Sequence, residues 1–355
     1  MSAPTVSVIM AVYNGAAVIG EAIDSLIAQR FKDFEVVIVD DGSTDRTREL
    51  LRSISDSRFR IIEAPINAGA VHARNLAFAE TRGKYIAALD HDDICHPDRF
   101  AMQVAYLDTH PDTVLVATAT QQLYEGSIRP SALPAMTSPA LVEWMLWICN
   151  PIVWSSVMLR SNAARELVPF TRPERLYAED FDLYHRLSDK GRIAQVDTEL
   201  LTYRSHAGGV SQRFIAAMEA SATQVFVDQH RELLGDEVTE RAALLVQHVM
   251  RQTPVPDRAT LMALGETIMT LQHAFLEHIR PADADIRLIR WGTARLWARI
   301  GRAALRSGMM GLADIVAVRP NHLGLGYASL NDLVVSAVVG GVRNASQSKA
   351  RVALG

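Results

Sequence analysis

Two short apolar runs, VSVIMAV at residues 6–12 and FEVVIV at residues 34–39, constrain the fold of this chain more than any other feature. Unbroken β-branched runs of this kind are typical of strands buried on both faces of a sheet. Apolar residues recur at helical spacing between the two runs, and residues 45–54 carry a second helical pattern. The order strand, helix, strand, helix predicts a mostly parallel sheet with right-handed crossovers.

The alternation continues along the chain, loosens from about residue 95, and gives way to a different pattern beyond Ser211. It predicts strands at 60–62, 85–89, 113–119, 153–159, 192–196 and 200–204, helices at 70–80, 97–108 and 180–188, and a long loop at 126–139. Beyond it lie Ala/Leu/Arg helices without a chemical motif. Because 355 residues exceed the usual size of one core, we expect an α/β domain over residues 1–215 and a helical region over 216–355.

Composition excludes several classes of protein. A net charge of −4 gives no general basic face, so we expect no nucleic-acid partner. Two cysteines, Cys95 and Cys149, make neither a disulfide framework nor a zinc site. No run reaches the roughly 20 apolar residues of a spanning helix, and the first residues lack a signal-peptide pattern. We therefore expect a cytoplasmic protein that does not cross the membrane.

The acidic segment Asp90-His91-Asp92-Asp93 directly follows the apolar strand YIAAL. In parallel sheets, ligands bind beyond the carboxyl ends of the strands. The carboxylates of Asp90 and Asp92 can face one cavity, where a divalent cation would link them to a diphosphate. A solvated turn that caps the next helix is an equally weighted alternative.

Two further segments near the same edge carry polar side chains. Asp41 follows the second strand and is placed to accept hydrogen bonds from a base or ribose, whereas Asp45 is better suited to cap the next helix. Arg74, on the helix after Asn67-Ala68-Gly69, suits contact with a phosphate or an aspartate. A surface salt bridge is the simpler interpretation of Arg74 alone.

Two later segments add a candidate base and a candidate metal ligand. Glu179 and Asp180 begin the helix FDLYHRL, where a carboxylate serves either as a general base toward an acceptor hydroxyl or as a helix cap. His206 follows a strand in the segment YRSH. It fits a metal shell or a diphosphate contact, and a structural role is the alternative.

Taken together and in this order, the segments resemble family 2 glycosyltransferases, which have the GT-A fold. The resemblance spans residues 5–212 and comprises VSVIMAVYNG, VIVDDGSTD, NAG with ARN, GKYIAALDHDD, SSVMLR, AED and YRSH. It implies a catalytic domain with a nucleotide-sugar half at 1–95 and an acceptor half at 96–215. Family members of this kind invert the anomeric centre, which implies a single in-line displacement.

The resemblance also implies a role for individual residues. Asp180 is the implied general base, and Asp92 is the implied ligand of Mg²⁺ or Mn²⁺ at the diphosphate, with His206 as a second metal ligand. Glu179 and Trp154 fall on the acceptor side. The implied donor-binding residues are Ala11, Tyr13, Asn14, Asp41, Arg74, Asp90, His91 and Asp92.

Two departures from the family pattern shape the expected reaction. Members with a similar Asn-Pro-Ile segment often carry histidine where this chain has Trp154, so an aromatic surface for a sugar face replaces a polar contact. The Gln-x-x-Arg-Trp pattern of processive synthases is absent. We therefore expect transfer of one sugar, from a donor that we take to be UDP-linked, to a hydroxyl of a glycan or glycolipid in bacterial-type cell-surface assembly.

Residues 286–306 contain six arginines and no acidic residue, interleaved with Trp291 and Trp297. Such a helix can lie on anionic lipid, which leaves peripheral attachment to the cytoplasmic face of the membrane open. The favoured alternative is a helix that packs on the first domain with a solvated arginine face. Residues 323–342 are likewise either an interfacial helix or a packing or oligomer helix.

Two rival functions remain. A nucleotidyltransferase would share the parallel sheet but should carry a glycine-rich basic loop after the first strand, where this chain has Tyr13-Asn14-Gly15-Ala16-Ala17. A non-catalytic nucleotide-sugar-binding module should have lost a metal or base carboxylate, yet Asp90, Asp92 and Asp180 are all present.

Overall fold

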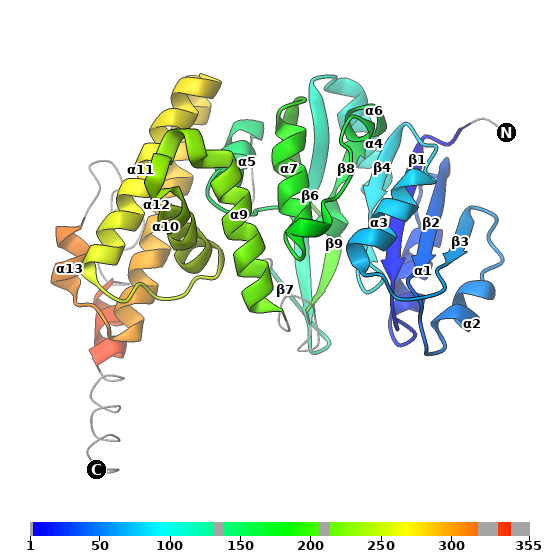
Figure 1. Ribbon diagram of the computed structural model, residues 1–355, viewed down its shortest axis with the longest axis horizontal. Coiled ribbons are helices and arrows are strands. Elements are labelled where there is room, and N and C mark those ends of the chain that lie inside the picture. The colour runs from blue at the N-terminus through cyan, green and yellow to red at the C-terminus, as the bar shows by residue number, and fades with distance from the viewer. Residues whose placement is uncertain (1–2, 131–137, 206–213, 319–332, 342–355) are drawn as a thin grey trace, which may run out of the picture. The chain divides into compact units, whose positions relative to one another are not determined.

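The computed structural model describes residues 3–130, 138–205, 214–318 and 333–341 (Figure 1). The chain divides into two compact units, one of Met1–Glu143 with Pro151–Ala222 and one of Trp144–Asn150 with Thr223–Gly355. Up to Ser205 the elements are β1 (Val6–Val12), α1 (Ile19–Ile27), β2 (Phe34–Asp40), α2 (Thr47–Arg52), β3 (Phe59–Glu63), α3 (Ala70–Ala79), β4 (Tyr85–Ala88), β5 (Ile94–Cys95), α4 (Arg99–Thr109), β6 (Thr113–Tyr124), β7 (Ser127–Pro130), α5 (Pro139–Leu146), η1 (Trp154–Ser156), β8 (Met158–Arg160), α6 (Ser161–Arg165), η2 (Pro173–Arg175), α7 (Glu179–Ser188) and β9 (Arg192–Ser205).

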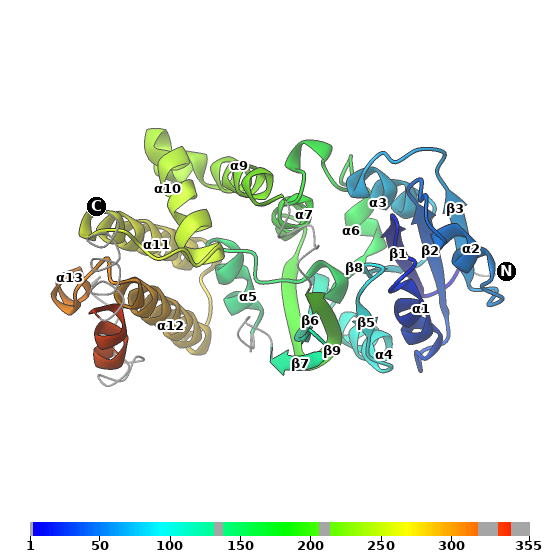
Figure 2. The same ribbon diagram turned by 90° about the horizontal axis from the view of Figure 1, so that it is seen from below.

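One sheet organises the first unit. Its strand order is β3-β2-β1-β4-β8-β6-β9-β5, with β7 paired to β6. The pairs β3–β2, β2–β1, β1–β4 and β6–β9 are parallel, and β8 runs antiparallel to both of its neighbours. Helix α3 covers one face, and α1 and α4 cover the other (Figure 2). The predicted α/β fold, a mostly parallel sheet flanked by helices, is confirmed.

Three local predictions differ from the structure. Residues 153–159 were expected to form a strand, but Trp154–Ser156 is a 3-10 helix and only Met158–Arg160 pairs in the sheet. The expected loop at 126–139 begins with β7, which forms a hairpin with β6; residues 131–137 lie outside the described residues. The two strands expected at 192–196 and 200–204 are one strand, β9, interrupted by register shifts in its pairing with β6.

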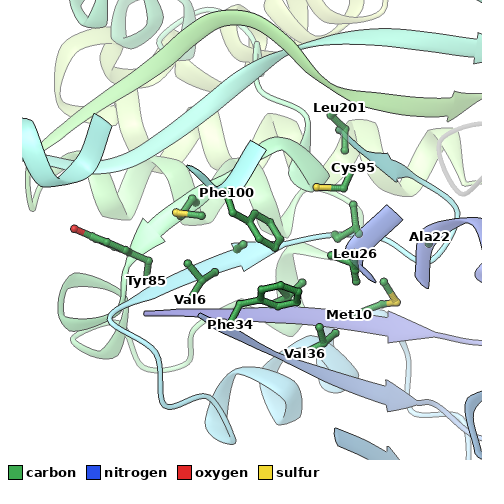
Figure 3. Close-up of a cluster of buried hydrophobic side chains, with 14 of the residues drawn as sticks. Val6, Met10, Ala22, Leu26, Phe34, Val36, Tyr85, Cys95, Phe100 and Leu201 are labelled. Carbon is green, nitrogen blue, oxygen red and sulfur yellow. The ribbon is translucent and has the colours of Figure 1, made fainter. Parts of the chain in front are cut away.

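The apolar runs of β1 and β2 supply the core beneath this sheet. Every residue of β2 is buried, as expected for a strand covered on both faces. Val6 and Met10 of β1 face a cluster that contains Leu26, Phe34 and Phe100, among others (Figure 3). The rings of Phe34 and Phe100 meet edge to face, with centroids 5.4 Å apart. This packing fixes the carboxyl ends of β1, β2 and β4, from which the polar turns project.

A buried polar pair on α4 holds the end of β4 against its neighbours. Arg99 is fully buried and donates to the carbonyl oxygens of Ala88 (3.0 Å) and Val157 (2.9 Å). Gln103 donates to the carbonyl oxygens of Val116 and Ser156, each at 2.9 Å. Because unpaired buried carbonyls are costly, these bonds fix the end of β4, which precedes the acidic turn, and the end of η1.

The second unit is helical. It contains most of α9 (Ile215–Leu234), then η3 (Gly235–Glu237), α10 (Val238–Leu244), η4 (Leu245–Met250), α11 (Arg258–Ile279), α12 (Asp283–Ser307) and α13 (Leu312–Ala317), and residues 333–341 are also helical. Trp144 donates from Nε1 to Thr293 Oγ1 on α12 (2.8 Å), and its ring lies 5.6 Å from that of Phe275 on α11. These contacts explain why residues 144–150 belong to this unit.

The apolar face of α12 is turned inward within its unit. Ile289, Leu296, Trp297 and Ile300 are each at most 5% exposed. Trp297 therefore packs in the helical core, whereas Trp291 is half-buried and its ring centroid lies 4.5 Å from the guanidinium carbon of Arg295. Across the described residues, no helix is both long and apolar enough to span a membrane.

Candidate active site

The turn after β1 is held by Asn14. Its backbone is left-handed, with φ of 52°, and its Oδ1 accepts from the amide of Thr44 (2.8 Å) while its own amide donates to Ser43 Oγ (2.9 Å). Asn14 thereby ties the β1 turn to the β2 turn. Tyr13 beside it is 45% exposed, and Ala11 at the end of β1 is half-buried. Tyr13 and Asn14 are thus exposed, and Ala11 is less accessible to a ligand.

The turn after β2 places Asp41 at the start of α3. Asp41 is 2% exposed, and its two carboxylate oxygens accept from the amides of Ala68 (2.9 Å) and Gly69 (2.8 Å). A carboxylate at a helix N-terminus is stabilised there by free amides. Gly42 takes φ of +74°, and a Cβ on it would lie 2.5 Å from the amide nitrogen of Asn67. The turn therefore needs glycine at this position.

Asp45 contributes to the start of α2, as the sequence indicated. Its Oδ1 accepts from the amide of Thr47 (2.9 Å), and its Oδ2 accepts from the amide of Ala16 (3.2 Å). Despite some desolvation, these hydrogen bonds lower the pKa of Asp45. The carboxylate of Asp45 thus stabilises the backbone of two loops.

The acidic turn after β4 is fixed by residues from two distant segments. The amide of Asp90 donates to Ser155 Oγ (2.9 Å) in η1. Arg204, in β9, donates from Nε to the carbonyl oxygen of Asp92 and from its amide to Asp93 Oδ1, both at 2.9 Å. The imidazole of His91 packs on Gly15, where a Cβ would lie 2.5 Å from His91 Cδ2.

Negative charge is concentrated in this turn. Asp93 is 1% exposed, and burial together with the carboxylates of Asp92 and Asp90 raises its pKa well above the usual value. Crowded carboxylates of this kind raise one another's pKa unless a cation balances them. Asp93 was not among the predicted site residues, although it belongs to the predicted acidic segment.

Arg74 joins the acidic turn to α7. Its guanidinium donates to Asp90 Oδ1 (2.9 Å) and to Glu179 Oε1 (2.5 Å). Its side chain is only 13% exposed, so this is a buried ion-pair network. Burial opposes the charge of Arg74, but the two carboxylates outweigh burial and raise its pKa. The structure thus gives Arg74 the aspartate contact that the sequence offered as one alternative.

Helix α7 brings three polar side chains to the same place. Asp180 is half-buried, and its Oδ1 accepts from the amide of Phe181 (2.8 Å). Glu179 is 5% exposed, and Tyr184, one turn beyond Asp180, is fully buried. Burial, and then the charge of Asp180, raise the pKa of the Tyr184 hydroxyl. The charges of Asp90 and Asp180 each contribute to the raised pKa values of Arg74 and Tyr184, so we assign both aspartates to one candidate site.

Three buried polar atoms at this site have no hydrogen-bond partner among the described residues. They are Arg74 Nε, Glu179 Oε2 and the Tyr184 hydroxyl. A buried donor or acceptor without a partner costs about 1–3 kcal/mol, and native proteins rarely leave several such atoms together. Their grouping indicates that a polar ligand or water completes the site.

Trp154 lies against the Arg74 guanidinium, whose central carbon is 4.8 Å from the ring centroid. Phe170 lies near its ring as well, at 6.4 Å between centroids. Trp154 is only 6% exposed, so most of its ring surface is already covered. It supports Arg74 from a buried position rather than presenting a free face.

The residues of the acidic turn fit a hard divalent cation. Carboxylate oxygens are the ligands that Mg²⁺ and Mn²⁺ prefer, and Asp90, Asp92 and Asp93 bring three carboxyl groups into this one turn. Within the described ranges, no group of three or more His, Cys, Asp or Glu residues is arranged to hold a metal. Such a cation would take ligands from the diphosphate too, as Mg²⁺ commonly does. His206 lies outside the described residues.

Comparisons with known proteins identify the family of this chain. The family model "Glycosyl transferase family 2" matches residues 7–166. The UDP-Glc:alpha-D-GlcNAc-diphosphoundecaprenol beta-1,3-glucosyltransferase WfaP of Escherichia coli is 31% identical over 211 residues, which are 58% of this chain and 79% of that protein.

Two solved structures share the fold. The S. aureus TarS 1–349 complex with UDP-GlcNAc has a TM-score of 0.56 at 18% identity and covers 96% of this chain and 92% of that chain. The mannosyltransferase PcManGT from Pyrobaculum calidifontis, in complex with GDP-Man and Mn²⁺, has a TM-score of 0.52 at 19% identity over 90% and 86% of the two chains. With its sheet, its acidic turn and its relatives in agreement, the chain belongs to glycosyltransferase family 2 and is a glycosyltransferase.

Proposed function

We propose that this glycosyltransferase moves one sugar, with inversion, from a nucleotide-diphosphate sugar to an acceptor hydroxyl in bacterial-type cell-surface glycan or glycolipid assembly. WfaP, by its name, takes UDP-glucose as donor and a diphosphoundecaprenol-linked acceptor. TarS was crystallised with UDP-GlcNAc. These similarities support a UDP-linked donor and a glycan or glycolipid acceptor.

The observation that carries the proposal is the Arg74 bridge. Asp90 follows a strand of the nucleotide-sugar half, Glu179 begins α7 in the acceptor half, and Arg74 bonds to both. Asp180 follows Glu179 in α7 and, like Asp90, raises the pKa of Arg74, which supports assigning it to the same site as the acidic turn. A base in this position would face the acceptor hydroxyl while the leaving diphosphate sits at the acidic turn.

In the proposed reaction the acceptor oxygen attacks the anomeric carbon, and its proton passes to a carboxylate oxygen of Asp180. The bond between the anomeric carbon and the phosphate oxygen breaks as the new glycosidic bond forms, and its electron pair leaves with the nucleotide diphosphate. Arg74 fixes the orientation of Asp90 and Glu179 throughout. Asp41 and the exposed ring of Tyr13 flank the nucleotide. A cation bound with Asp92 would stabilise the negative charge that develops on the diphosphate.

The unpaired buried atoms fit a sugar. A pyranose carries donor and acceptor hydroxyls on a rigid ring, so one sugar can pair with a guanidinium nitrogen, a carboxylate oxygen and a phenol together. We propose that sugar hydroxyls pair with Arg74 Nε, Glu179 Oε2 and the Tyr184 hydroxyl. A site built to pair with hydroxyls discriminates strongly against analogues that lack them.

A thermal-shift screen of nucleotide sugars, with and without Mn²⁺, tests the donor. We expect one UDP-sugar to raise the melting temperature more than UDP alone and to do so mainly with Mn²⁺, because a ligand that binds only the folded state stabilises it. Stabilisation by free sugar phosphates with a nucleoside triphosphate would instead favour a nucleotidyltransferase.

Asp180→Asn tests the base. We expect a fall in kcat of roughly 10²- to 10⁴-fold, the usual contribution of a general base, with donor affinity by calorimetry nearly unchanged. Asp189→Asn is the matched control, because Asp189 follows the same helix and is exposed. Weakened donor binding with transfer preserved would contradict the assignment.

A further inference from the structure

The C-terminal part of the second unit differs in charge from the rest of the chain. Residues 286–355 contain ten Arg and Lys residues and only two acidic residues, a net charge of +8, whereas residues 1–285 carry −12. Such an asymmetry is typical of chains that bind an anionic polymer or membrane through one segment. The positive charge is locally strong although the whole protein is slightly acidic.

Part of this charge forms a stripe along α12. Four arginines of α12 follow one another at spacings of four, three and four residues, so they lie on one side of the helix. They are Arg295, Arg299, Arg302 and Arg306. Arg295 and Arg306 are exposed and Arg302 is half-buried. Burial, and to a smaller extent the positive charge of Arg302, lower the pKa of Arg299. No acidic residue interrupts the stripe within α12.

The stripe ends at a short helix that exposes valines. Arg306 Nε donates to Ser336 Oγ (3.2 Å) in the helix at residues 333–341. Leu333 and Ser336 are buried, and a Cβ on Gly340 would collide with the carbonyl oxygen of Leu305. The helix therefore packs on the end of α12 through one narrow face, and its backbone approaches α12 closely at Gly340.

The opposite face of this helix is apolar and accessible. Val334, Val335, Val338 and Val339 are 45%, 55%, 61% and 36% exposed. At 100° per residue they span roughly 140° of the helix surface. Met309, directly after α12, and Val316 on α13 are 63% and 52% exposed. We call the exposed side chains of Val334, Val335, Val338 and Val339 the valine surface.

We propose that the valine surface, together with the α12 arginine stripe that ends beside it, docks this protein on a bilayer of anionic phospholipids. Apolar side chains enter the boundary between headgroups and acyl chains, and arginines pair with lipid phosphates. Charge complementarity favours anionic lipid over a second copy of the same basic surface, which like charges would repel. Trp297 takes no part, because it is buried.

This proposal is independent of the catalytic assignment, because its readout is lipid binding. Full-length protein is sedimented with vesicles of phosphatidylcholine alone and of phosphatidylcholine mixed with phosphatidylglycerol. We expect binding only to the anionic vesicles, and loss of binding when the salt concentration is raised to about 0.5 M, because surface attraction is screened over a few ångströms there. Equal binding to both kinds of vesicle, or to neither, would overturn the proposal.

Substitution tests the valine surface itself. Val335→Asp with Val338→Asp should lower the partition coefficient on anionic vesicles by roughly tenfold or more, since charge is excluded from the acyl region. Met262→Asp, at a 50% exposed position on α11, is the matched control and should retain binding. Circular dichroism should show equal melting temperatures for all three proteins. If the double variant keeps vesicle binding and instead changes a dimer into a monomer, the valine surface is a self-association surface.

Discussion

Two buried tyrosines differ in whether the protein itself provides a hydrogen-bond partner for the hydroxyl. We expect the hydroxyl without a protein partner to contact substrate and the paired one to stabilise the fold. Tyr184 is fully buried and has no hydrogen-bond partner for its hydroxyl among the described residues, whereas the hydroxyl of Tyr85 donates to Asp108 (2.6 Å). Removing the first hydroxyl costs the unliganded protein no hydrogen bond. Removing the second one does. The two tyrosines therefore make a matched pair for experiment.

We expect Tyr184→Phe to leave the melting temperature unchanged or slightly higher and to lower kcat/KM for the donor or the acceptor roughly tenfold, the effect of one lost hydrogen bond. Tyr85→Phe should do the reverse, with lower stability and unchanged kinetics. Steady-state kinetics and thermal unfolding of both variants provide the measurement. A destabilised Tyr184→Phe with normal kinetics would show that the hydroxyl has a structural partner.

At the level of elements, the turn after β2 depends on one glycine. Gly42 has φ of +74° and lies against the backbone of Ile66 and Asn67. We expect Gly42→Ala to destabilise the protein by at least about 1 kcal/mol, because a Cβ is disfavoured at this φ and also clashes. Donor affinity should fall as well, because a shift of the backbone at Gly42 would displace the preceding residue, Asp41, which we propose to flank the nucleotide.

The control for this prediction is Gly20→Ala. Gly20 lies in α1, and a Cβ there meets nothing within 4 Å. Alanine should raise helix stability by roughly 0.5–1 kcal/mol. Denaturant unfolding of the two variants measures both effects, and equal stabilities would refute the steric argument for Gly42.

Helix α9 contains a buried histidine, His230, that makes the stability of the folded protein depend on pH. His230 is 2% exposed, its Nε2 hydrogen-bonds the carbonyl oxygen of Trp147 (2.9 Å), and burial lowers its pKa to about 4 from 6.5. Between pH 6.5 and 4 the unfolded chain binds this proton and the folded protein does not. Stability therefore falls as the pH falls through this window, by at most about 1.4 kcal/mol per pH unit.

His230→Gln should flatten this part of the stability profile, since glutamine does not titrate. His273→Gln, at an exposed position on α11, should leave the slope unchanged. Chemical denaturation at several pH values between 4 and 7 compares them. The same slope in wild type and His230→Gln would show that other groups cause the acid sensitivity.

Strands with unbroken apolar runs were predictable from the sequence. Elements whose conformation depends on hydrogen bonds to distant residues were not. β1 and β2 were found at their expected places because burial on both faces leaves a continuous apolar pattern. The pattern at 153–159 is also mainly apolar, but its two serines, Ser155 and Ser156, are buried, and Ser155 Oγ accepts from the amide of Asp90. Local sequence does not show such a partner 65 residues away.

At the scale of the whole molecule, the sequence indicated which segments meet but not how their charges balance. Order along the chain suggested that Asp90 and Asp180 share a pocket. It did not show that Arg74 would be buried between Asp90 and Glu179, nor that Arg204 would anchor Asp92 and Asp93. Charge balance among buried groups depends on three-dimensional distances, which periodicity and spacing do not encode.

The Arg74 bridge has a consequence for how the protein is made on the ribosome. Its two carboxylates lie 16 and 105 residues further along the chain, so Arg74 gains its second partner only after α7 has emerged. The match to the family model ends at residue 166, before either Glu179 or Asp180. A nascent or excised chain that ends at residue 166 contains Arg74 and Asp90 but not Glu179. Its Arg74 guanidinium would therefore have only one of its two carboxylate partners. Synthesis must pass α7 before the bond between Arg74 and Glu179 can form.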